Sequence, residues 1–335
     1  MALGSIPTGA IRYNTDSNKM ECFNGTKWMQ VAVSNPDLNG GTRGFNMGGY
    51  SPDYTQTIEY VNIATQGDSV TFGDLLWPIH LGTAGGNRTR ALHAGGSGPH
   101  ASMSSVIGYI TVSSTGDALD FGDTTVPVYG LGATNNQTRM VHMAGYWPGG
   151  SRNDMHYNTI ASTGDSVDFG DAVQPTYTPC DCNSPTRGIL VGGNHPTPGT
   201  NHLNVLQYIT ISTTGASIDF GDVAHAQYYS HGGASSATRG VFGGAYQPSM
   251  SASTDYITMA TLGNSVNFGD LLISRFSLTA TSSTTRGIFM GGRTPTLQDT
   301  IDYITIATQG DAVDFGNKQT TFAYGAATSN GHGGL

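Results

Sequence analysis

The sequence predicts an all-β protein built from six similar four-stranded sheets, and three observations lead to this expectation. A segment of about 48 residues recurs six times along the chain, and each copy is marked by a Thr-Arg dipeptide. Every copy contains short runs of β-branched and aromatic residues and no run with helical spacing. Glycine accounts for 48 of the 335 residues, about twice its ordinary share.

Three landmarks align the copies. The Thr-Arg dipeptides begin at Thr42, Thr89, Thr138, Thr186, Thr238 and Thr285. A tyrosine follows in every copy, and a phenylalanine comes twelve residues after it, from Tyr60 and Phe72 to Tyr303 and Phe315. Gly-Asp or Gly-Asn lies between them in all copies except the fourth, which has Gly215-Ala216. Because such a pair suits a two-residue turn, the fixed interval predicts a hairpin of two strands.

Two further strands are predicted in each copy. A strand of small residues, such as "LGTAGGN", precedes each Thr-Arg, and an apolar strand such as "GIFMGG" follows it. Strands with so few large side chains fit where sheets crowd around an axis. Residues 301–307 place apolar side chains on both faces, as expected for a sheet covered by neighbours on both sides. Four-stranded sheets that repeat radially in this way form a β-propeller.

The ends of the chain predict how the repeat closes. The first copy has no strand of small residues before Thr42, whereas the last copy is followed by one at residues 323–331. We expect this last segment to lie beside residues 43–49 and to complete the first sheet. The prediction is therefore a closed, six-bladed β-propeller that spans residues 42–335.

The repeat resembles the kelch repeat, which has a small-residue inner strand, an arginine, an apolar strand ending in Gly-Gly, a tyrosine strand and an outer strand. The tryptophan of many kelch outer strands is replaced here by the phenylalanine of "DFGD". The six arginines of the Thr-Arg dipeptides occupy equivalent framework positions. We expect each to brace its own blade through hydrogen bonds to carbonyl groups or to a neighbouring carboxylate, and not to bind a ligand.

Charge and composition argue against several classes of function. The net charge is −9, and no run of Lys or Arg occurs, so binding to nucleic acid is not expected. No apolar stretch reaches membrane-spanning length, and the N-terminus lacks the features of a secretory signal, so neither membrane insertion nor export by that route is expected. Cys180 and Cys182 lack further metal ligands in the sequence and are predicted to be buried thiols. No cofactor and no catalytic set is predicted, so we do not expect an enzyme.

The loops that follow Gly-Gly carry the variation between copies. They differ in length and content, yet each contains a proline. In four-stranded blades these loops share one face with the connections between blades, and rigid frameworks often bind through such loops. Exposed aromatic side chains suit sugar faces or protein hot spots. The predicted ligand-binding residues are Tyr50, Tyr54, Trp77, His100, Tyr146, Trp147, His195, His202, Tyr246 and Arg293. The alternative is that these loops vary because nothing constrains them.

Residues 1–33 lie outside the repeat and predict a small β module with strands "AIRYN", "KMECFN" and "KWMQV", followed by a linker at residues 34–41. This segment resembles a short adaptor module of phage tail-fibre and other virion proteins, and Arg12, Tyr13, Asn14 and Trp28 fill its pattern. About thirty residues cannot bury a core alone. The resemblance therefore implies a homo-oligomer, with a trimer favoured, and contacts with other virion proteins.

The whole chain, adaptor plus repeats, resembles structural proteins of tailed phages, particularly those that infect cyanobacteria. The resemblance implies a virion protein, either a tail fibre or a spike tip, that recognises a glycan or a protein on the host surface. One alternative is a capsid or tail decoration protein that contacts only other virion subunits. A second alternative is a glycan hydrolase.

Overall fold

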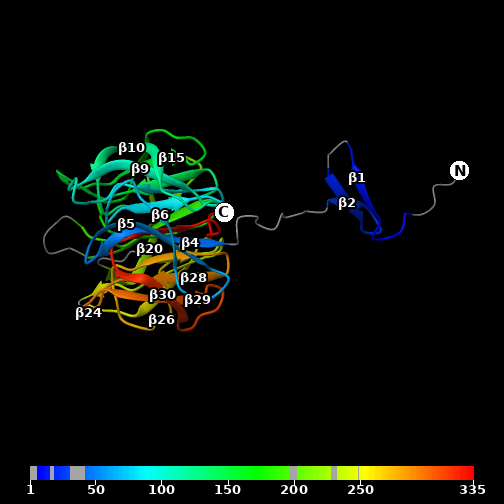
Figure 1. The fold of residues 1–335 in the computed structure, drawn as a ribbon. Coiled ribbons are helices and arrows are strands. Elements are labelled where there is room, and N and C mark those ends of the chain that lie inside the picture. The colour runs from blue at the N-terminus through cyan, green and yellow to red at the C-terminus, as the bar shows by residue number, and fades with distance from the viewer. Residues whose placement is uncertain (1–5, 16–18, 31–41, 196–201, 228–231, 248) are drawn as a thin grey trace. The chain divides into compact units, whose positions relative to one another are not determined.

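The structure is a computed structural model that describes residues 6–15, 19–30, 42–195, 202–227, 232–247 and 249–335. The secondary structure of the described residues consists of β-strands, without a helix, which confirms the all-β prediction. The chain divides into two compact units, Met1–Leu38 and Asn39–Leu335, drawn in Figure 1. The predicted linker at residues 34–41 lies outside the described residues.

The small unit is an antiparallel sheet with the strand order β1-β2-β3. Its strands are β1 (Ile11–Asn14), β2 (Lys19–Phe23) and β3 (Trp28–Gln30). The Arg12 guanidinium donates a hydrogen bond of 2.8 Å to Glu21 and lies 4.3 Å from the centroid of the Trp28 ring. Asn14 donates a 3.0 Å bond to the same carboxylate. Three of the four predicted adaptor residues therefore form one cluster around Glu21.

Tyr13, the fourth predicted adaptor residue, belongs to the other face of this sheet. The strand register places Ile11 and Tyr13 on one face with Met20 and Met29. These four side chains are between 42% and 64% exposed. The small sheet thus has one face with a bonded cluster of charged, polar and aromatic side chains, and one apolar face that the described part of the unit leaves open to solvent.

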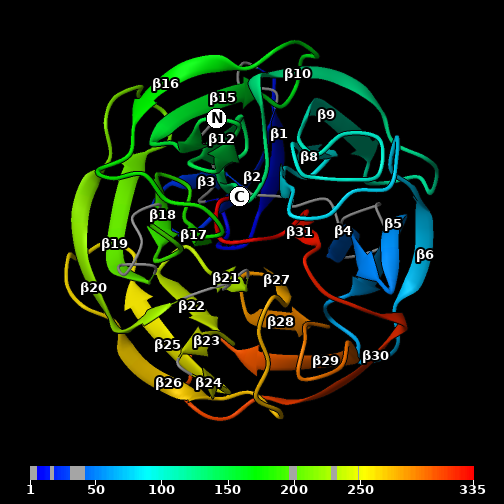
Figure 2. The same ribbon diagram turned by 90° about the vertical axis from the view of Figure 1, so that its left-hand side faces the viewer.

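The described residues of the large unit form six four-stranded antiparallel sheets, which we name A to F. In strand order they are A (β31-β4-β5-β6), B (β7-β8-β9-β10), C (β11-β12-β15-β16), D (β17-β18-β19-β20), E (β21-β22-β25-β26) and F (β27-β28-β29-β30). Figure 2 shows the first strands near the middle of the unit and the fourth strands at its periphery. The predicted four-stranded sheets are confirmed.

The strand bounds repeat from sheet to sheet. The first strands are β31 (Ala326–Ser329), β7 (Thr83–Gly86), β11 (Gly132–Asn135), β17 (Cys180–Asn183), β21 (Gly233–Ser235) and β27 (Thr279–Ser282). The second strands are β4 (Arg43–Ser51), β8 (Arg90–Ala94), β12 (Arg139–Met143), β18 (Arg187–Val191), β22 (Arg239–Gly243) and β28 (Arg286–Met290). Each second strand therefore begins at the arginine of a Thr-Arg dipeptide.

The outer half of each sheet follows the same scheme. The third strands are β5 (Asp53–Asn62), β9 (Ser104–Thr111), β15 (Asp154–Thr159), β19 (Leu203–Thr210), β25 (Ser253–Thr258) and β29 (Gln298–Thr305). The fourth strands are β6 (Val70–Asp74), β10 (Leu119–Val128), β16 (Val167–Asp171), β20 (Ile218–Gln227), β26 (Val266–Asp270) and β30 (Val313–Phe322). Two short hairpins decorate loops of sheets C and E, namely β13 (Tyr146–Trp147) with β14 (Gly150–Ser151), and β23 (Tyr246–Gln247) with β24 (Ser249–Met250).

The hydrophobic core lies between the sheets. Six clusters of buried side chains each combine residues of two sheets, in the pairs A–B, B–C, C–D, D–E, E–F and F–A. In the A–B cluster, for example, Phe45 and Phe72 pack with Ile110 and Val112. This placement explains why the strands carry apolar residues on both faces. Cys180 and Cys182 lie in the D–E cluster, so the prediction of buried thiols is confirmed.

The twelve-residue interval between tyrosine and phenylalanine has a packing cause. In every sheet the two rings meet across the third and fourth strands, with centroids 5.9 to 6.1 Å apart and steep interplanar angles. Such edge-to-face contacts are favourable beyond the area they bury. The arginine of the same sheet lies over the tyrosine ring, at 4.4 to 4.9 Å from its centroid. A change in the interval would separate these groups.

The predicted two-residue turn at Gly-Asp is wrong. In sheet A, β5 ends at Asn62 and β6 begins at Val70, so Gly67 lies within a longer connection. The amide of Gly67 donates to the carbonyl of Phe315 in sheet F, and the equivalent glycines make the same bond to each preceding sheet, at 2.7 to 3.0 Å. These glycines have φ of about 150°, a backbone conformation that residues with side chains rarely adopt.

The acidic residue of the pair extends this contact. Asp117 of sheet B accepts a hydrogen bond from the amide of Asp74 in sheet A, and Asp68, Asp165, Asn264 and Asp311 do the same at their own interfaces, at 2.8 to 3.0 Å. Ala216, the one exception in the sequence, has no side-chain acceptor. The "GD" motif of one sheet and the "DFGD" motif of the preceding sheet are therefore joined by two hydrogen bonds, one from the glycine amide and one to the Asp or Asn side chain. We call this pair of contacts the clasp.

The six framework arginines also join neighbouring sheets, which corrects the expectation that each braces its own sheet. The guanidinium of Arg43 in sheet A donates to the carbonyl of Val112 in sheet B at 2.7 Å. Arg286 in sheet F donates to the carbonyls of Ile63 and Ala64 in sheet A. The same guanidinium lies over the tyrosine ring of its own sheet, so it contacts that ring and the neighbouring sheet together.

The two ends of the large unit meet within sheet A. β31 pairs antiparallel with β4, from Ala326 opposite Met47 to Ser329 opposite Gly44, as predicted from the sequence. Asn330 accepts a 2.8 Å bond from the amide of Arg43. The turns of the other sheets contain the same bond, for example from Arg90 to Asn87. A non-covalent contact thus occupies the place where the other sheets have a continuous chain.

The clasp generates a prediction about glycine. A Cβ atom on Gly122 would lie 2.5 Å from the backbone of Gly164, whereas a Cβ atom on Gly164 would meet nothing within 4 Å. Both glycines have positive φ. We expect Gly164→Ala to lower the free energy of unfolding by about 1 to 3 kcal/mol through strain alone, and Gly122→Ala to lower it clearly more. Denaturant unfolding measures the free energy of unfolding of both variants. Equal decreases in the two variants would contradict the close contact between Gly122 and Gly164.

Candidate binding site on the loop side

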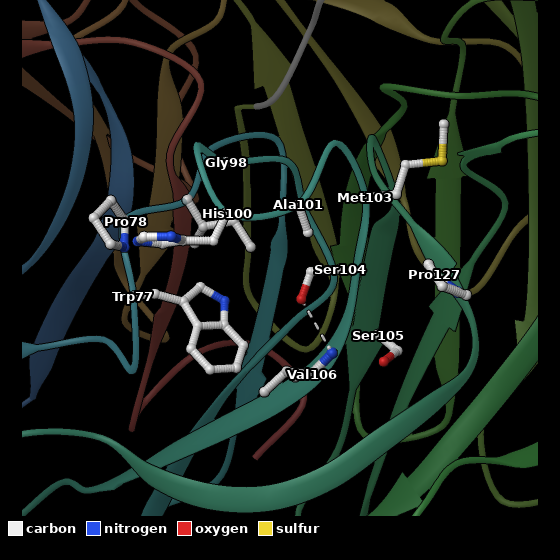
Figure 3. A pocket seen from close by; sticks show the side chains of 11 residues that line it. Trp77, Pro78, Gly98, His100, Ala101, Met103, Ser104, Ser105, Val106 and Pro127 are labelled. Atoms are coloured by element: carbon white, nitrogen blue, oxygen red, sulfur yellow. Dashed lines mark hydrogen bonds between the residues drawn. The ribbon is translucent and has the colours of Figure 1, made fainter.

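A cavity of about 280 Å³ lies between two loops of the large unit, and Figure 3 shows it from close by. One wall comes from residues 75–82, which connect sheet A to sheet B, and the other from residues 95–103, which join β8 to β9. The lining residues are Trp77, Pro78, Ile79, Gly98, His100, Ala101, Met103, Ser104, Ser105, Val106 and Pro127. Two predicted binding residues, Trp77 and His100, are therefore brought together.

Backbone hydrogen bonds hold the two walls against each other. The amides of His80 and Ser97 each donate to the carbonyl of the other residue at 2.8 Å. A Cβ atom on Gly98 would lie 2.4 Å from the carbonyl oxygen of Pro78, so the walls approach this closely because position 98 is glycine. Buried Ile79 anchors the first wall, while Trp77 remains 37% exposed. The cavity is thus built on paired backbone and not on a free loop.

The lining is apolar with a few hydroxyl groups. The Ser104 oxygen accepts a 3.2 Å bond from the amide of Val106, drawn in Figure 3. The Ser105 hydroxyl donates a 2.9 Å bond to Asp123. None of the described residues that line the cavity is Asp, Glu, Lys or Arg.

The other predicted residues form separate clusters. Tyr50 and Tyr54 pack edge to face at 6.1 Å, and His80 lies 4.8 Å from the Tyr54 ring. Tyr146 lies between Tyr129 and Tyr177, at 5.4 and 5.6 Å. These rings stabilise the loops by packing on one another, so the loop residues do not all point to one ligand.

The remaining predicted residues lie elsewhere along the loops. Trp147 is covered by the guanidinium of Arg152, 4.4 Å from its ring. Tyr246 packs 5.4 Å from Phe276, and Arg293 forms a backbone β-bridge with the same phenylalanine. His195 is half-buried and His202 is exposed on either side of residues 196–201, which lie outside the described residues. The sequence missed Met103, Ser104, Ser105 and Pro127, because no local pattern connects β10 to the loop 95–103.

The six sheets alternate between two lengths of the fourth strand, and the sequence motifs did not predict this alternation. The fourth strands of sheets B, D and F have ten residues, whereas those of A, C and E have five. Residues 72–83, 169–180 and 268–279 therefore align without a gap and form three equivalent connections. Leu81, Thr178 and Ser277 occupy the same place and share a positive φ of 53° or 54°.

Within this threefold pattern the first connection is distinctive. Trp77 corresponds to Gln174 in the second connection and to Ile273 in the third. Ile79 corresponds to Arg275, which is fully buried and pairs with Asp302 at 3.0 Å. The connection between sheets A and B is thus the one of the three that has an aromatic side chain at the position of Trp77.

One buried polar cluster elsewhere contains Ser166, His142 and Asn158. The Ser166 hydroxyl lies 3.0 Å from Nε2 of His142, but Asn158 approaches the same nitrogen at 2.8 Å. In the described part of the chain, no group of three or more His, Cys, Asp and Glu is placed to hold a metal ion.

Comparison of the chain with known protein families and with curated proteins finds no match to either. The described residues contain no helix that is long and apolar enough to cross a membrane.

Burial depresses the basicity of several histidines. It lowers the pKa of His80 beside the cavity, and of buried His93, His142 and His332, to about 4 in each case. Asp181 has the opposite shift: burial raises the pKa of its carboxyl to about 7. Asp181 lines a cavity of about 30 Å³ between the first strands and accepts a 3.2 Å bond from the amide of Ala133.

These shifts predict a stability profile. An unfolded histidine binds a proton below pH 6.5 while the folded one stays neutral down to about pH 4, so each buried histidine removes stability as pH falls between these values. At pH 5 the free energy of unfolding is therefore lower by up to about 2 kcal/mol for each of these histidines. The raised pKa of Asp181 has the opposite effect, because the folded carboxyl binds its proton at a higher pH than the unfolded one. This single group does not offset the four histidines named above. We expect the melting temperature to fall between pH 7 and pH 5.

A matched variant checks the cause. Asn46 in sheet A occupies the position of His93 in sheet B. His93→Asn should therefore fold and should flatten the dependence of the melting temperature on pH. A profile that is level from pH 7 to pH 5 in the unchanged protein would contradict the assignment.

Proposed function

We propose that this chain is a structural protein of a tailed-phage virion, a tail fibre or spike tip that binds the host surface through the loop side of a six-bladed β-propeller. The observation that carries the proposal is the cavity at Trp77 and His100, built by two loops on one side of a stack of rigid sheets. The resemblance of the repeats and of the N-terminal module to phage structural proteins supports the setting.

The closed propeller is part of this proposal. The clasp, the arginine bond and the buried cluster occur at the F–A interface as they do between sheets that follow one another in the chain. Lys318 of sheet F adds a buried ion pair of 2.7 Å with Glu59 of sheet A. These contacts support a ring in which β31 completes the first blade.

The mechanism in this proposal is non-covalent. Preorganised loops bind with little loss of conformational freedom, because their backbone is already paired. Several copies of the chain on one virion convert weak single contacts into avidity. An N-terminal module that associates with other copies, and with other virion proteins, supplies the multiple copies that avidity requires.

The first test concerns the host surface. Purified full-length protein should bind cells of a susceptible host and should reduce adsorption of the phage when added in excess. Fluorescently labelled protein and a plaque assay measure the two effects. Binding to assembled virus particles with no binding to cells would contradict the proposal and favour the decoration protein. Release of reducing sugar from host polysaccharide would favour the hydrolase.

The second test concerns the oligomer. The apolar face of the small sheet exposes Ile11 and Met29, with exposed fractions of 64% and 46%. We expect the full chain to sediment as a trimer, with about three times the 35.0 kDa mass of one chain. Ile11→Lys combined with Met29→Lys should give monomers, because two charges would be buried unpaired in the contact. Thr26→Lys combined with Thr8→Lys, in exposed turns, is the matched control. A monomeric unchanged chain would contradict this part.

A further inference from the structure

We propose that the cavity lined by Trp77, His100 and Ser104 binds one uncharged sugar residue of a glycan. This inference rests on the proposed function in one respect, namely that ligands bind at the loops that follow Gly-Gly and at the connections between sheets. It adds the chemical class of the ligand, which follows from the size, the walls and the charge of the cavity.

The size of the cavity limits the ligand to about one ring. Its volume of about 280 Å³ lies just below the range of about 300 to 1,000 Å³ that is typical of sites for drug-sized ligands. Met103 and Pro127 border the cavity on the side opposite Trp77, as Figure 3 shows. A ligand therefore enters with one terminal or side-chain unit, and any remaining part of it stays in solvent.

The walls match a ring that has one apolar face and several hydroxyl groups. Trp77 contributes a broad aromatic surface, and a pyranose packs its C–H face on such a surface. The Ser104 oxygen already accepts from Val106, so its hydroxyl hydrogen is suited to donate to a ligand. The Ser105 hydroxyl donates to Asp123, so its oxygen is suited to accept. Adjacent serines thus supply one donor and one acceptor, as sugar hydroxyls require.

The charge of the lining excludes anionic sugars as the preferred ligand. A carboxylate, sulfate or phosphate would enter a cavity that has no Lys or Arg in its lining and would lose hydration without a charged partner. A proline-rich peptide is also disfavoured. Such peptides lie in extended grooves with several aromatic side chains, whereas Trp77 is the single Trp, Tyr or Phe among the described residues that line this bounded cavity.

The experiment is saturation-transfer difference NMR on the full-length protein. The probes are the methyl glycosides of glucose, galactose, mannose and N-acetylglucosamine, with sialic acid, glucose 6-phosphate and a proline-rich peptide as comparison ligands. We expect at least one neutral glycoside to receive saturation. Its dissociation constant, measured by titration, should rise tenfold or more in Trp77→Gln, which installs the residue found at Gln174 in the equivalent connection.

Two further variants keep the test decisive. Ala101→Trp should block the cavity by filling it, without removing a side chain that the fold uses. Leu272→Ala is the matched control, because Leu272 is the exposed counterpart of Leu76 in the third connection and lies outside the cavity. We expect its dissociation constant to equal that of the unchanged protein. Melting temperatures of all three variants separate loss of binding from loss of folding.

The outcomes distinguish this inference from the proposed function. Preference for the anionic probes or the peptide, or neutral-sugar binding that survives both Trp77→Gln and Ala101→Trp, would overturn the inference. Absence of saturation in every neutral glycoside would also overturn it, and adsorption to host cells would then still stand on its own. Conversely, neutral-sugar binding without adsorption to cells would support the cavity assignment and overturn the proposed function.

Discussion

Close approach between the backbones of neighbouring sheets is the constraint on which the large unit depends. A glycine of each outer strand lies against a glycine of the next connection, so that a Cβ atom on the first would come within 2.2 to 2.6 Å of the second. At this separation the amide of the second glycine reaches a carbonyl of the outer strand. Neither contact tolerates a side chain at the first glycine. Six of the 48 glycines are therefore a requirement of the packing between sheets.

This constraint separates the residues that build the unit from those that are available for binding. The repeated Arg, Tyr and Phe, together with the Gly-Asp pair, are occupied by contacts within and between sheets. The loops after Gly-Gly take little part in these contacts, so their length and composition are free to differ. A rigid framework with variable loops on one side can present different side chains without altering the packing between sheets.

The sequence predicted the all-β fold, the four strands of each sheet and the pairing of β31 with β4, because these depend on local periodicity and on counting. It did not predict the partner of each framework group. The Gly-Asp pair and Arg43 have patterns that suit contacts within a sheet, yet they bond to a neighbour. The cavity was predicted in part, since Trp77 and His100 stand out as exposed side chains in loops. Pro127 was not predicted, because it lines the cavity from β10, a strand distant in the sequence from both loops.

The threefold alternation shows how the connection at the cavity differs from its two equivalents. All three connections have the same length and the same left-handed residue, so the backbone framework is shared. The connections differ in the side chain at one equivalent position, which is Ile79 in the first connection, Thr176 in the second and Arg275 in the third. In the third connection the buried Arg275 donates to the carbonyls of Thr300 and Phe289 and pairs with Asp302. In the first connection the smaller Ile79 stands at that position, and Trp77 forms a wall in front of it. Connections that share one backbone framework thus differ through a few side chains, while the contacts between sheets that fix the backbone stay the same.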